Sequence, residues 1–526
     1  MSMVHNPVLP GCYPDPSLCR VGADYYLVSS TFEYFPGLPV FHSIDLVHWN
    51  QIGHVITRAD QLDYSGIASS GGLYAPTIRY HDGTFWLVCT LVDQNDATRG
   101  GNFLMTADDP AGPWSDPIWL DADGIDPSIF FDDDGRVWMH GTRPARQPQW
   151  EQQTEVWIRE YDPVTQRLIG EETIIWNGAM LGVVWAEAPH LYKIDGTYYL
   201  LAAEGGTEIH HSEAVARSAS VTGPYETNKC NPIITHRHLG REVDVVGAGH
   251  ADLVQAADGS WWAFLLAMRI YGGYHYPLGR ETFLVPVTWQ DGWPVFAPGV
   301  GRIPPTVEVP FADDAPLGVA QGAVGGPVSP DDLRWTSLRG PADFATVEGG
   351  ALRLRPTSDT LRDAGTPAFL GIRQQHRCAD FTVTLQPALA EGEEAGLVIR
   401  QGERDHVRMG IRPAAGGGYT VSAVHCSGGG ELTLGSAEIG EGPVQLAIKA
   451  CDRDYALTCT GAGAQEIVVG HADSSTLDTI ATGGFLGLWL GVYIQAEGQP
   501  GRGSVTVSSV EYQPTAEAER GSCSCH

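Results

Sequence analysis

The sequence predicts an all-β protein in which a five-bladed β-propeller (residues 1–302) is joined by a linker (303–330) to a β-sandwich domain (331–513). One hairpin pattern recurs five times within residues 5–300, at intervals expected for propeller blades. Strand-like alternation resumes in the last domain without that pattern. The segment between them is rich in Pro, Gly, Ala and Val, as linkers are, and we expect the tail 514–526 to be disordered.

The hairpin pattern is clearest in residues 184–200. A short strand leads to an Asp-Gly turn at Asp195–Gly196 and then to a second, aromatic-rich strand, which is typical of a β-hairpin. The five copies are 60, 51, 62 and 63 residues apart and begin at Asp15, Ala75, Asp126, Ala188 and Ala251. A motif of strands and turns repeated at this period favours blades arranged around one axis.

The register of the repeat gathers charged residues at one place. The first strand of each blade runs beside the central channel, so equivalent positions converge at one mouth of it. Asp15 and Asp126 occupy the same repeat position, and three further residues precede it by one in their own blades: Tyr74, Glu187 and His250. Because apolar residues are the default at a crowded axis, three carboxylates there indicate a function.

The composition excludes several classes of partner. The chain has 32 basic and 63 acidic residues and a net charge of −31, so it repels phosphate backbones and we expect no nucleic-acid partner. No apolar run reaches membrane-spanning length, and we expect no membrane partner and no targeting leader. The spacing of the ten cysteines gives neither a zinc framework nor a dense disulfide pattern, which favours a reduced, cytoplasmic protein. Cys523-Ser-Cys-His526 could bind a metal, but a loose polar tail is the simpler interpretation.

Three carboxylates without a redox or phosphate motif favour acid–base hydrolysis. Crowded like charges cannot all stay ionised, so their pKa values should separate into those of a general acid and a general base. Glycoside cleavage needs such a pair: carboxyl groups roughly 6.5–9.5 Å apart give inversion of configuration, and about 5 Å gives retention. Asp15 and Glu187 belong to blades one and four, which are not neighbours, so we expect the wider gap.

Five motifs occur in order along the chain: Tyr13-Pro-Asp-Pro-Ser17, Ile125-Asp-Pro-Ser-Ile129, Ala186-Glu-Ala-Pro-His190, Gly249-His-Ala-Asp-Leu253 and Gly279-Arg-Glu-Thr282. Together they resemble glycoside hydrolase family 43, and within it the two-domain bacterial β-xylosidases and α-L-arabinofuranosidases. The resemblance spans nearly the whole chain, including the linker and the tail domain that begins near Asp331, which implies a concanavalin-like sandwich.

The resemblance implies an inverting enzyme that removes sugars from chain ends. Asp15 would be the general base that activates water, and Glu187 the general acid that protonates the leaving oxygen. Asp126 would orient Glu187 and keep its pKa high. The enzyme would require no cofactor.

Two residues would make the main contacts with the released sugar in its pocket, the −1 pocket. Arg280 would hydrogen-bond that sugar; without the motif, an ion pair with Glu281 or Asp244 would be preferred. Phe32 would form an apolar wall, and packing within its own loop is the alternative.

Further pocket residues follow from the same resemblance: Ala75, Ile125 and Thr207 as lining, and Glu208 and His211 as candidate substrate contacts in a loop that departs from the usual pattern of the β-xylosidase branch. His250 would be a ligand of a calcium ion otherwise surrounded by water. One histidine is a poor calcium site, since hard cations prefer oxygen ligands, so a buried core histidine is the alternative.

Tyr74 is a departure, because the β-xylosidase branch commonly has Trp at this position. A smaller, hydroxyl-bearing ring reshapes the pocket and leaves open which sugar is preferred. We expect release of terminal D-xylose from short β-1,4-xylooligosaccharides together with α-L-arabinofuranosidase activity. The alternatives are a dedicated α-L-arabinofuranosidase acting on hemicellulose fragments and a sugar-binding propeller whose catalysis has lapsed. We also expect a sandwich loop near Phe485 to close the site, and a homo-oligomer.

Overall fold

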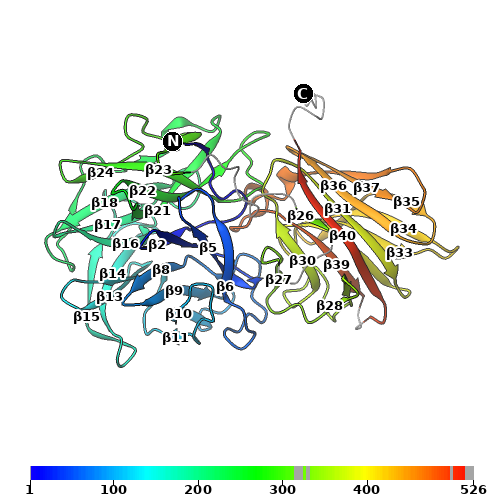
Figure 1. Cartoon of the computed structure of the whole chain (residues 1–526), viewed down its shortest axis with the longest axis horizontal. Coiled ribbons are helices and arrows are strands. Elements are labelled where there is room, and N and C mark those ends of the chain that lie inside the picture. The colour runs from blue at the N-terminus through cyan, green and yellow to red at the C-terminus, as the bar shows by residue number, and fades with distance from the viewer. Residues whose placement is uncertain (1, 313–323, 327–331, 498–500, 516–526) are drawn as a thin grey trace.

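The computed structural model describes residues 2–312, 324–326, 332–497 and 501–515. Two all-β bodies lie side by side along its longest axis, with the propeller formed by the N-terminal part of the chain and the sandwich by the C-terminal part (Figure 1). The predicted fold class is confirmed. Residues 516–526 of the predicted tail, with Cys523-Ser-Cys-His526, lie outside the described residues, as do 313–323 and 327–331 of the predicted linker.

Five antiparallel sheets of the described chain form the propeller blades. Blade one contains β2 (Ser17–Val21), β3 (Asp24–Val28), β5 (Gly37–Ser43) and β6 (Asn50–Ile56). Blade two contains β7 (Gly72–Leu73), β8 (Thr77–His81), β9 (Thr84–Val92), β10 (Gly100–Ala107) and β11 (Ile118–Trp119). Blade three contains β12 (Ile125–Phe131), β13 (Val137–Pro144), β14 (Thr154–Asp162) and β15 (Arg167–Trp176).

The last two blades complete the ring. Blade four contains β16 (Glu187–Ile194), β17 (Thr197–Glu204), β18 (Ser212–Ser218), β19 (Glu226–Thr227) and β20 (Ile234–Thr235). After the short 3-10 helix η1 (Arg237–Leu239), blade five contains β21 (Val245–Gln255), β22 (Trp261–Arg269), β23 (Glu281–Gln290) and β24 (Trp293–Phe296).

Local sequence explains the tight hairpins within the blades. The Asp195–Gly196 pair connects β16 to β17 as predicted, with φ of 49° and 78°. Two-residue hairpin turns with positive φ at both positions match the twist of the flanking strands, and Asp-Gly adopts them readily. The pair Asp82–Gly83 does the same between β8 and β9.

The ring is closed by the two ends of the propeller domain. The inner strands β2, β8, β12, β16 and β21 contact one another in that order, and β21 contacts β2. Strand β1 (Ser2–His5) pairs with β25 (Thr306–Val309), so part of the stretch predicted as a linker is a strand of the closure. A hydrophobic cluster that includes Leu18, Trp49 and Phe264 joins blades one and five.

Asp252 ties four blades together at the axis. Its Oδ2 accepts hydrogen bonds from Ser17 Oγ (2.8 Å) and from the backbone N–H of Leu18 (3.0 Å), both on β2. Arg79 of β8 donates to both carboxylate oxygens, and Tyr192 of β16 donates to Oδ1 (2.5 Å). Burial alone would raise the pKa of Asp252, but the Arg79 guanidinium holds it well below its ordinary value. The inner strands are therefore joined by a buried, ionised pair.

The C-terminal domain is a sandwich of two antiparallel sheets. The larger sheet contains β26 (Val324–Gly326), β28 (Ala345–Glu348), β29 (Ala351–Leu354), β31 (Cys378–Ala388), β36 (Val444–Cys451), β37 (Asp454–Thr460), β38 (Ile467–Asp473) and β40 (Ser504–Pro514). The six-stranded sheet contains β30 (Ala368–Arg373), β32 (Glu393–Arg400), β33 (His406–Pro413), β34 (Tyr419–Ser427), β35 (Gly430–Ile439) and β39 (Trp489–Ala496). Alternating apolar residues such as Phe381, Leu397 and Val492 fill the space between the sheets.

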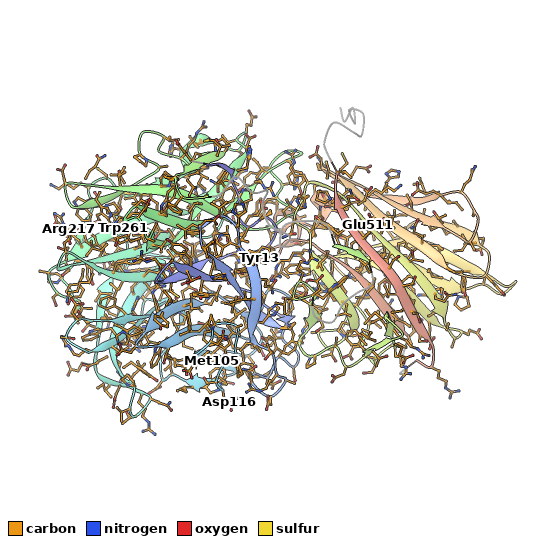
Figure 2. All side chains as sticks on the ribbon, in the orientation of Figure 1. Tyr13, Met105, Asp116, Arg217, Trp261 and Glu511 are labelled. Carbon is orange, nitrogen blue, oxygen red and sulfur yellow. The ribbon has the colours of Figure 1, made fainter. Side chains whose placement is uncertain are left out.

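The two domains share an interface beside the mouth of the channel. Strand β4 (Tyr34–Phe35) of the propeller pairs with β27 (Ser337–Leu338), and the Tyr34 ring stacks on Trp489 of the sandwich with ring centroids 3.8 Å apart. Tyr13, labelled between the two bodies in Figure 2, lies under Arg373, whose Cζ is 4.4 Å from the ring centroid. The connection from β38 to β39, with η3 (Ser474–Thr476) and α1 (Thr479–Thr482), belongs to this side of the sandwich. None of the helices in the described ranges has the length and apolar character needed to span a membrane.

We predict that Asp252→Asn lowers the free energy of unfolding by about 3 kcal/mol, because it leaves the partly buried Arg79 charge without its fully buried counter-charge. Urea denaturation followed by tryptophan fluorescence measures the loss. The matched control is Asp258→Asn, at an exposed position in the turn between β21 and β22. Equal unfolding midpoints for Asp252→Asn and the unaltered protein would contradict the role of Asp252.

Candidate active site

A cavity of about 110 Å³ lies at the mouth of the propeller channel. Its lining comes from all five blades and from the sandwich, and consists of Asp15, Phe32, Tyr74, Ala75, Ile125, Asp126, Glu187, Ala203, Thr207, His211, His250, Arg280 and Phe485. Every site residue predicted from the sequence lines it except Glu208. The expectation for Phe485 is confirmed by its place in the lining. Ala203 was missed, and a small apolar residue inside a strand carries no signal that distinguishes it from core.

Irregular backbone points the central side chains into the channel. Asp15, Asp126 and His250 have φ of 55°, 52° and 55°. Pairing of β12 with β13 shifts register after Ile125, and pairing of β16 with β17 shifts after Glu187. Such β-bulges bend a strand and redirect its side chains, and Asp and His tolerate positive φ better than most residues. In blades three, four and five the inner strand therefore carries a bulge beside Asp126, Glu187 and His250, whereas the β2–β3 pairing that follows Asp15 is regular.

Asp15 is buried and held by donors. Ser30 Oγ donates to its Oδ2 (2.5 Å), and Arg280 Nη1 donates to its Oδ1 (2.9 Å). The same Arg280 nitrogen donates to Thr207 Oγ1 (3.3 Å), and His250 Nδ1 lies 3.4 Å from Asp15 Oδ1. Donors and a guanidinium favour the ionised carboxylate, which can accept a proton from water.

Arg280 belongs to this site and not to a peripheral ion pair. Glu281, considered as its partner from the sequence, is instead bound by Arg269, with two contacts of 2.7 Å. The alternative considered from the sequence, an ion pair of Arg280 with Glu281, is therefore wrong. The Arg280 Cζ also lies 5.6 Å from the ring centroid of Phe32 and 5.4 Å from that of Phe485, so its cationic head sits between a carboxylate and two aromatic faces.

Asp126 and Glu187 have displaced pKa values. Asp126 Oδ2 accepts a hydrogen bond from the backbone N–H of Ala188 (3.0 Å), which ties Asp126 to the residue after Glu187. Burial, and then the negative charge of Asp15, raise the pKa of Asp126 to about 7. Burial, and then the charges of Asp126 and Asp15, raise the pKa of Glu187 well above its ordinary value. Glu187 can therefore keep a proton near neutral pH.

Three aromatic rings form one wall of the cavity. The centroids of Phe32 and Tyr74 are 5.7 Å apart, and those of Phe32 and Phe485 are 6.1 Å apart in a stacked arrangement. The Tyr74 hydroxyl accepts a hydrogen bond from Gln94 Nε2 (2.9 Å). Two blades and the sandwich thus supply an apolar surface suited to the carbon face of a sugar ring.

The loop after β17 extends the site on one side. Glu208 was predicted as a candidate substrate contact. It does not line the main cavity but a smaller adjoining one, together with Tyr276 and Thr479. Nδ1 of His211 lies 3.0 Å from the carbonyl oxygen of Gly247, and burial lowers the pKa of His211 to about 4. His211 is therefore neutral at physiological pH.

The residues around His250 do not by themselves form a calcium cage. Among the described residues no group of three or more His, Cys, Asp and Glu side chains is placed to hold a metal ion. The carboxylate of Asp15, beside His250, is already engaged by Ser30 and Arg280. A calcium ion here would take its other ligands from water.

Comparison with known proteins decides the family. Residues 4–294 match the model of "Glycosyl hydrolases family 43", and residues 330–513 match "Beta xylosidase C-terminal Concanavalin A-like domain". The chain belongs to glycosyl hydrolase family 43. It is a glycosidase with an oligosaccharide substrate, and its sandwich is of the concanavalin type.

Relatives of this family member match along almost its full length. It is 39% identical to a xylosidase/arabinosidase of Butyrivibrio fibrisolvens, over 95% of this chain and 97% of the relative. It is also 39% identical to a non-reducing end alpha-L-arabinofuranosidase of Bacteroides ovatus, over 94% and 92% of the two chains. The crystal structure of a xylan beta-1,4-xylosidase from Bacillus halodurans is 34% identical and superposes with a TM-score of 0.90, over 97% of this chain and all of that one.

The raised pKa of Glu187 predicts a stability effect that depends on pH. The native state keeps the Glu187 proton above pH 4.5, the ordinary pKa, where the unfolded chain loses it, so native stability falls as pH rises from 4.5 through the raised pKa. Glu187→Gln removes that loss. Its gain in free energy of unfolding over the unaltered protein should be larger at about pH 8 than at about pH 5, by roughly 1 kcal/mol or more.

Thermal unfolding at both pH values measures this difference. Glu151→Gln, at an exposed position, is the control and should show the same difference from the unaltered protein at both. A Glu187→Gln gain that stays constant with pH would show that Glu187 is not held protonated in the native state.

Proposed function

We propose that this enzyme is an inverting glycosidase that releases terminal D-xylose from short β-1,4-xylooligosaccharides and has α-L-arabinofuranosidase activity as well. The observation that carries the proposal is the meeting of a donor-held carboxylate, Asp15, and a carboxyl of strongly raised pKa, Glu187, in one small cavity. Inverting glycosidases need these two states at the same time.

Asp15 is assigned as the general base. Its hydrogen bonds from Ser30 and Arg280 favour the ionised form, which takes a proton from the attacking water. The water attacks the anomeric carbon from the side opposite to the leaving oxygen, so a β-linked sugar is released as the α-anomer.

Glu187 is assigned as the general acid that protonates the leaving oxygen. Asp126 supports it in two ways. Its negative charge adds to the effect of burial in raising the pKa of Glu187, and its hydrogen bond with the Ala188 N–H fixes the backbone beside that residue. The small cavity, walled by Phe32, Tyr74 and Phe485, suits one sugar residue and therefore cleavage at a chain end.

Proton NMR of xylobiose hydrolysis tests the proposal directly. We expect α-xylose to appear before mutarotation, and an aryl α-L-arabinofuranoside to be cleaved in parallel. Initial release of β-xylose would refute inversion. Binding of these sugars without cleavage of either would favour the alternative of a propeller whose catalysis has lapsed.

Substrates with different leaving groups separate the two catalytic roles. Glu187→Gln should lower kcat on xylobiose by about 10²–10⁴-fold but have much less effect on a nitrophenyl xyloside, whose leaving group needs no proton. Asp15→Asn should reduce turnover of both substrates similarly, because water must be activated in each case. Steady-state kinetics of both variants decide this, with Glu151→Gln as the control. If Glu187→Gln lost both activities equally, the acid role would be untenable.

A dedicated α-L-arabinofuranosidase is the second candidate, and Tyr74 favours it. The Tyr74 hydroxyl, held by Gln94, gives the pocket wall a group that can accept a hydrogen bond, which the donor-only indole of a Trp would not supply. The Bacteroides ovatus relative carries the name of that activity.

Tyr74→Trp should therefore raise the ratio of kcat/KM for the xyloside to that for the arabinofuranoside, by about ten-fold, since a larger ring reshapes the pocket. Parallel kinetics with the two nitrophenyl glycosides measure the ratio. Tyr74→Phe, which removes only the hydroxyl, separates polarity from size. A ratio that Tyr74→Trp leaves unchanged would remove Tyr74 as a determinant of sugar preference.

Three further features belong to the same proposal. A role in xylan degradation follows from the proposed substrate, and a cytoplasmic location is supported by free, buried thiols such as Cys12, Cys19 and Cys89. We infer a homo-oligomer from the resemblance alone, and sedimentation tests it.

We also propose that a calcium ion binds at His250, with water as its other ligands. Activity measured after chelation and after restoration of calcium tests this site.

A further inference from the structure

A buried carboxylate stands directly behind the aromatic wall of the pocket. Glu33 follows Phe32 in the chain and is completely buried. Its Oε1 accepts a hydrogen bond from Ser69 Oγ (2.8 Å), and its Oε2 accepts one from the backbone N–H of Ser70 (3.1 Å). Burial raises the pKa of Glu33, and a nearby positive charge opposes that rise.

The sandwich domain supplies that charge. Arg400, at the end of β32, is completely buried, and its Nη1 donates to Glu33 Oε1 (3.1 Å) and to the Tyr34 hydroxyl (2.9 Å). Its Nη2 donates to Ser69 Oγ (3.1 Å). One guanidinium of the second domain thus holds three polar groups of the propeller.

Ser70 connects this ion pair to the other two aromatic rings. Its Oγ accepts a hydrogen bond from the backbone N–H of Phe485 (2.9 Å). Its carbonyl oxygen accepts one from Gln94 Nε2 (2.9 Å), and the same nitrogen donates to the Tyr74 hydroxyl. Phe32 is connected by the chain itself, so all three rings are attached to the pair of Glu33 and Arg400.

A second carboxylate balances the charges. Glu403 accepts hydrogen bonds from Arg400 Nη2 (3.3 Å), from Arg339 and from the backbone N–H of Ser69 (3.2 Å). Burial would raise its pKa, but the two guanidinium groups lower the pKa of Glu403 to about 2. Two arginines and two carboxylates therefore form one buried network that spans the domain interface.

We propose that Arg400 is a positioning residue for the sugar pocket: by anchoring Glu33 and, through it, Ser70, it sets the places of Phe32, Tyr74 and Phe485. The sandwich then acts on the pocket through a buried charge as well as through the aromatic ring it contributes. This role rests on the proposed function in that the three rings are taken to bind the released sugar.

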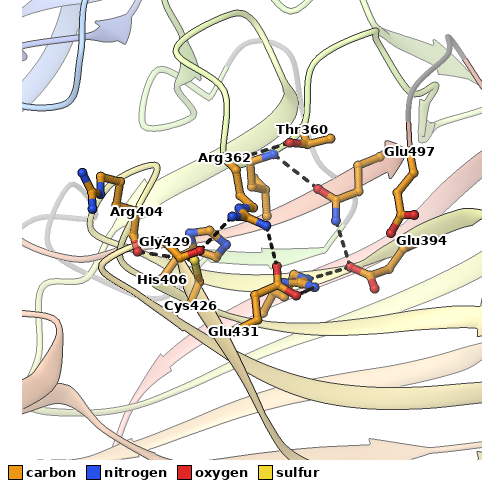
Figure 3. Close-up of polar contacts among 12 residues, drawn as sticks. Thr360, Arg362, Glu394, Arg404, His406, Cys426, Gly429, Glu431 and Glu497 are labelled. Carbon is orange, nitrogen blue, oxygen red and sulfur yellow. Dashed lines mark hydrogen bonds and ion pairs between the residues drawn. The ribbon is translucent and has the colours of Figure 1, made fainter.

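Arg408 provides a matched control in the same sheet. It lies on β33, is also buried, and donates to Glu394 Oε1 (3.0 Å) and Glu431 Oε1 (2.9 Å). Figure 3 shows Glu394 and Glu431 within a polar network made of sandwich residues. Arg408→Met therefore removes a buried arginine of this domain without touching the contacts that reach the pocket.

The experiment compares Arg400→Met with Arg408→Met in the full-length protein. Hydrolysis of nitrophenyl β-xyloside and α-L-arabinofuranoside gives KM and kcat, and hydrogen exchange with mass spectrometry follows residues 66–75 and 483–488. We expect Arg400→Met to raise KM by about ten-fold or more with kcat within about three-fold, because loose rings weaken ground-state and transition-state binding alike. Exchange of both segments should rise. Arg408→Met should leave KM within about two-fold and exchange of both segments unchanged, and Arg400→Lys should restore part of the affinity.

Unchanged KM and unchanged exchange in Arg400→Met would overturn the proposal, as would equal effects of the two variants. If the unaltered protein cleaves neither glycoside, the proposed function fails, while the exchange data still decide whether Arg400 orders the two segments. If Arg400→Met does not fold, Ser70→Ala replaces it, since this change removes only the acceptor for the Phe485 N–H. It should then raise KM and exchange at 483–488, and no change in either would equally overturn the proposal.

Discussion

Three carboxyl groups meet at one mouth of the propeller channel, where Asp15 and Asp126 are buried and Glu187 is half-buried. Their mutual repulsion must be held in place by the surrounding fold. Separate loops could move apart to relieve it. Here the inner strands are joined by the ion pair of Arg79 with the buried Asp252, and bulges redirect the backbone at Asp126 and Glu187. Burial, and then this repulsion, therefore raise the pKa values of Asp126 and Glu187.

The second domain completes the site in two different ways. The ring of Phe485 lines the cavity, and the guanidinium of Arg400 donates a hydrogen bond to Glu33 of the propeller. Without the sandwich, the cavity would lack the ring of Phe485, and Glu33 would lack the guanidinium of Arg400. This dependence gives a physical reason for the catalytic and sandwich domains to occur in one chain, with a shared interface that includes the paired strands β4 and β27.

Carboxylates and pocket walls have separate tasks in such an enzyme. The two principal carboxyl groups suit cleavage of either a xyloside or an arabinofuranoside, because both reactions pass through similar charge development at the anomeric carbon. The walls select the sugar that fits. Relatives named for one activity, the other or both share the fold of this chain, which agrees with selection by a few wall residues such as Tyr74.

The architecture and the acidic residues of the site could be predicted from the sequence. The spacing of five hairpins and turns such as Asp195–Gly196 are local signals, and the repeat register alone placed Asp15, Asp126 and Glu187 together. Only the tertiary structure decided which groups meet across long sequence distances. It paired Arg280 with Asp15 and Glu281 with Arg269, placed β25 in the closure of the ring, and brought Arg400 to Glu33. Ion pairing and pKa displacement depend on burial and on charges from distant segments, and a linear pattern does not encode those distances.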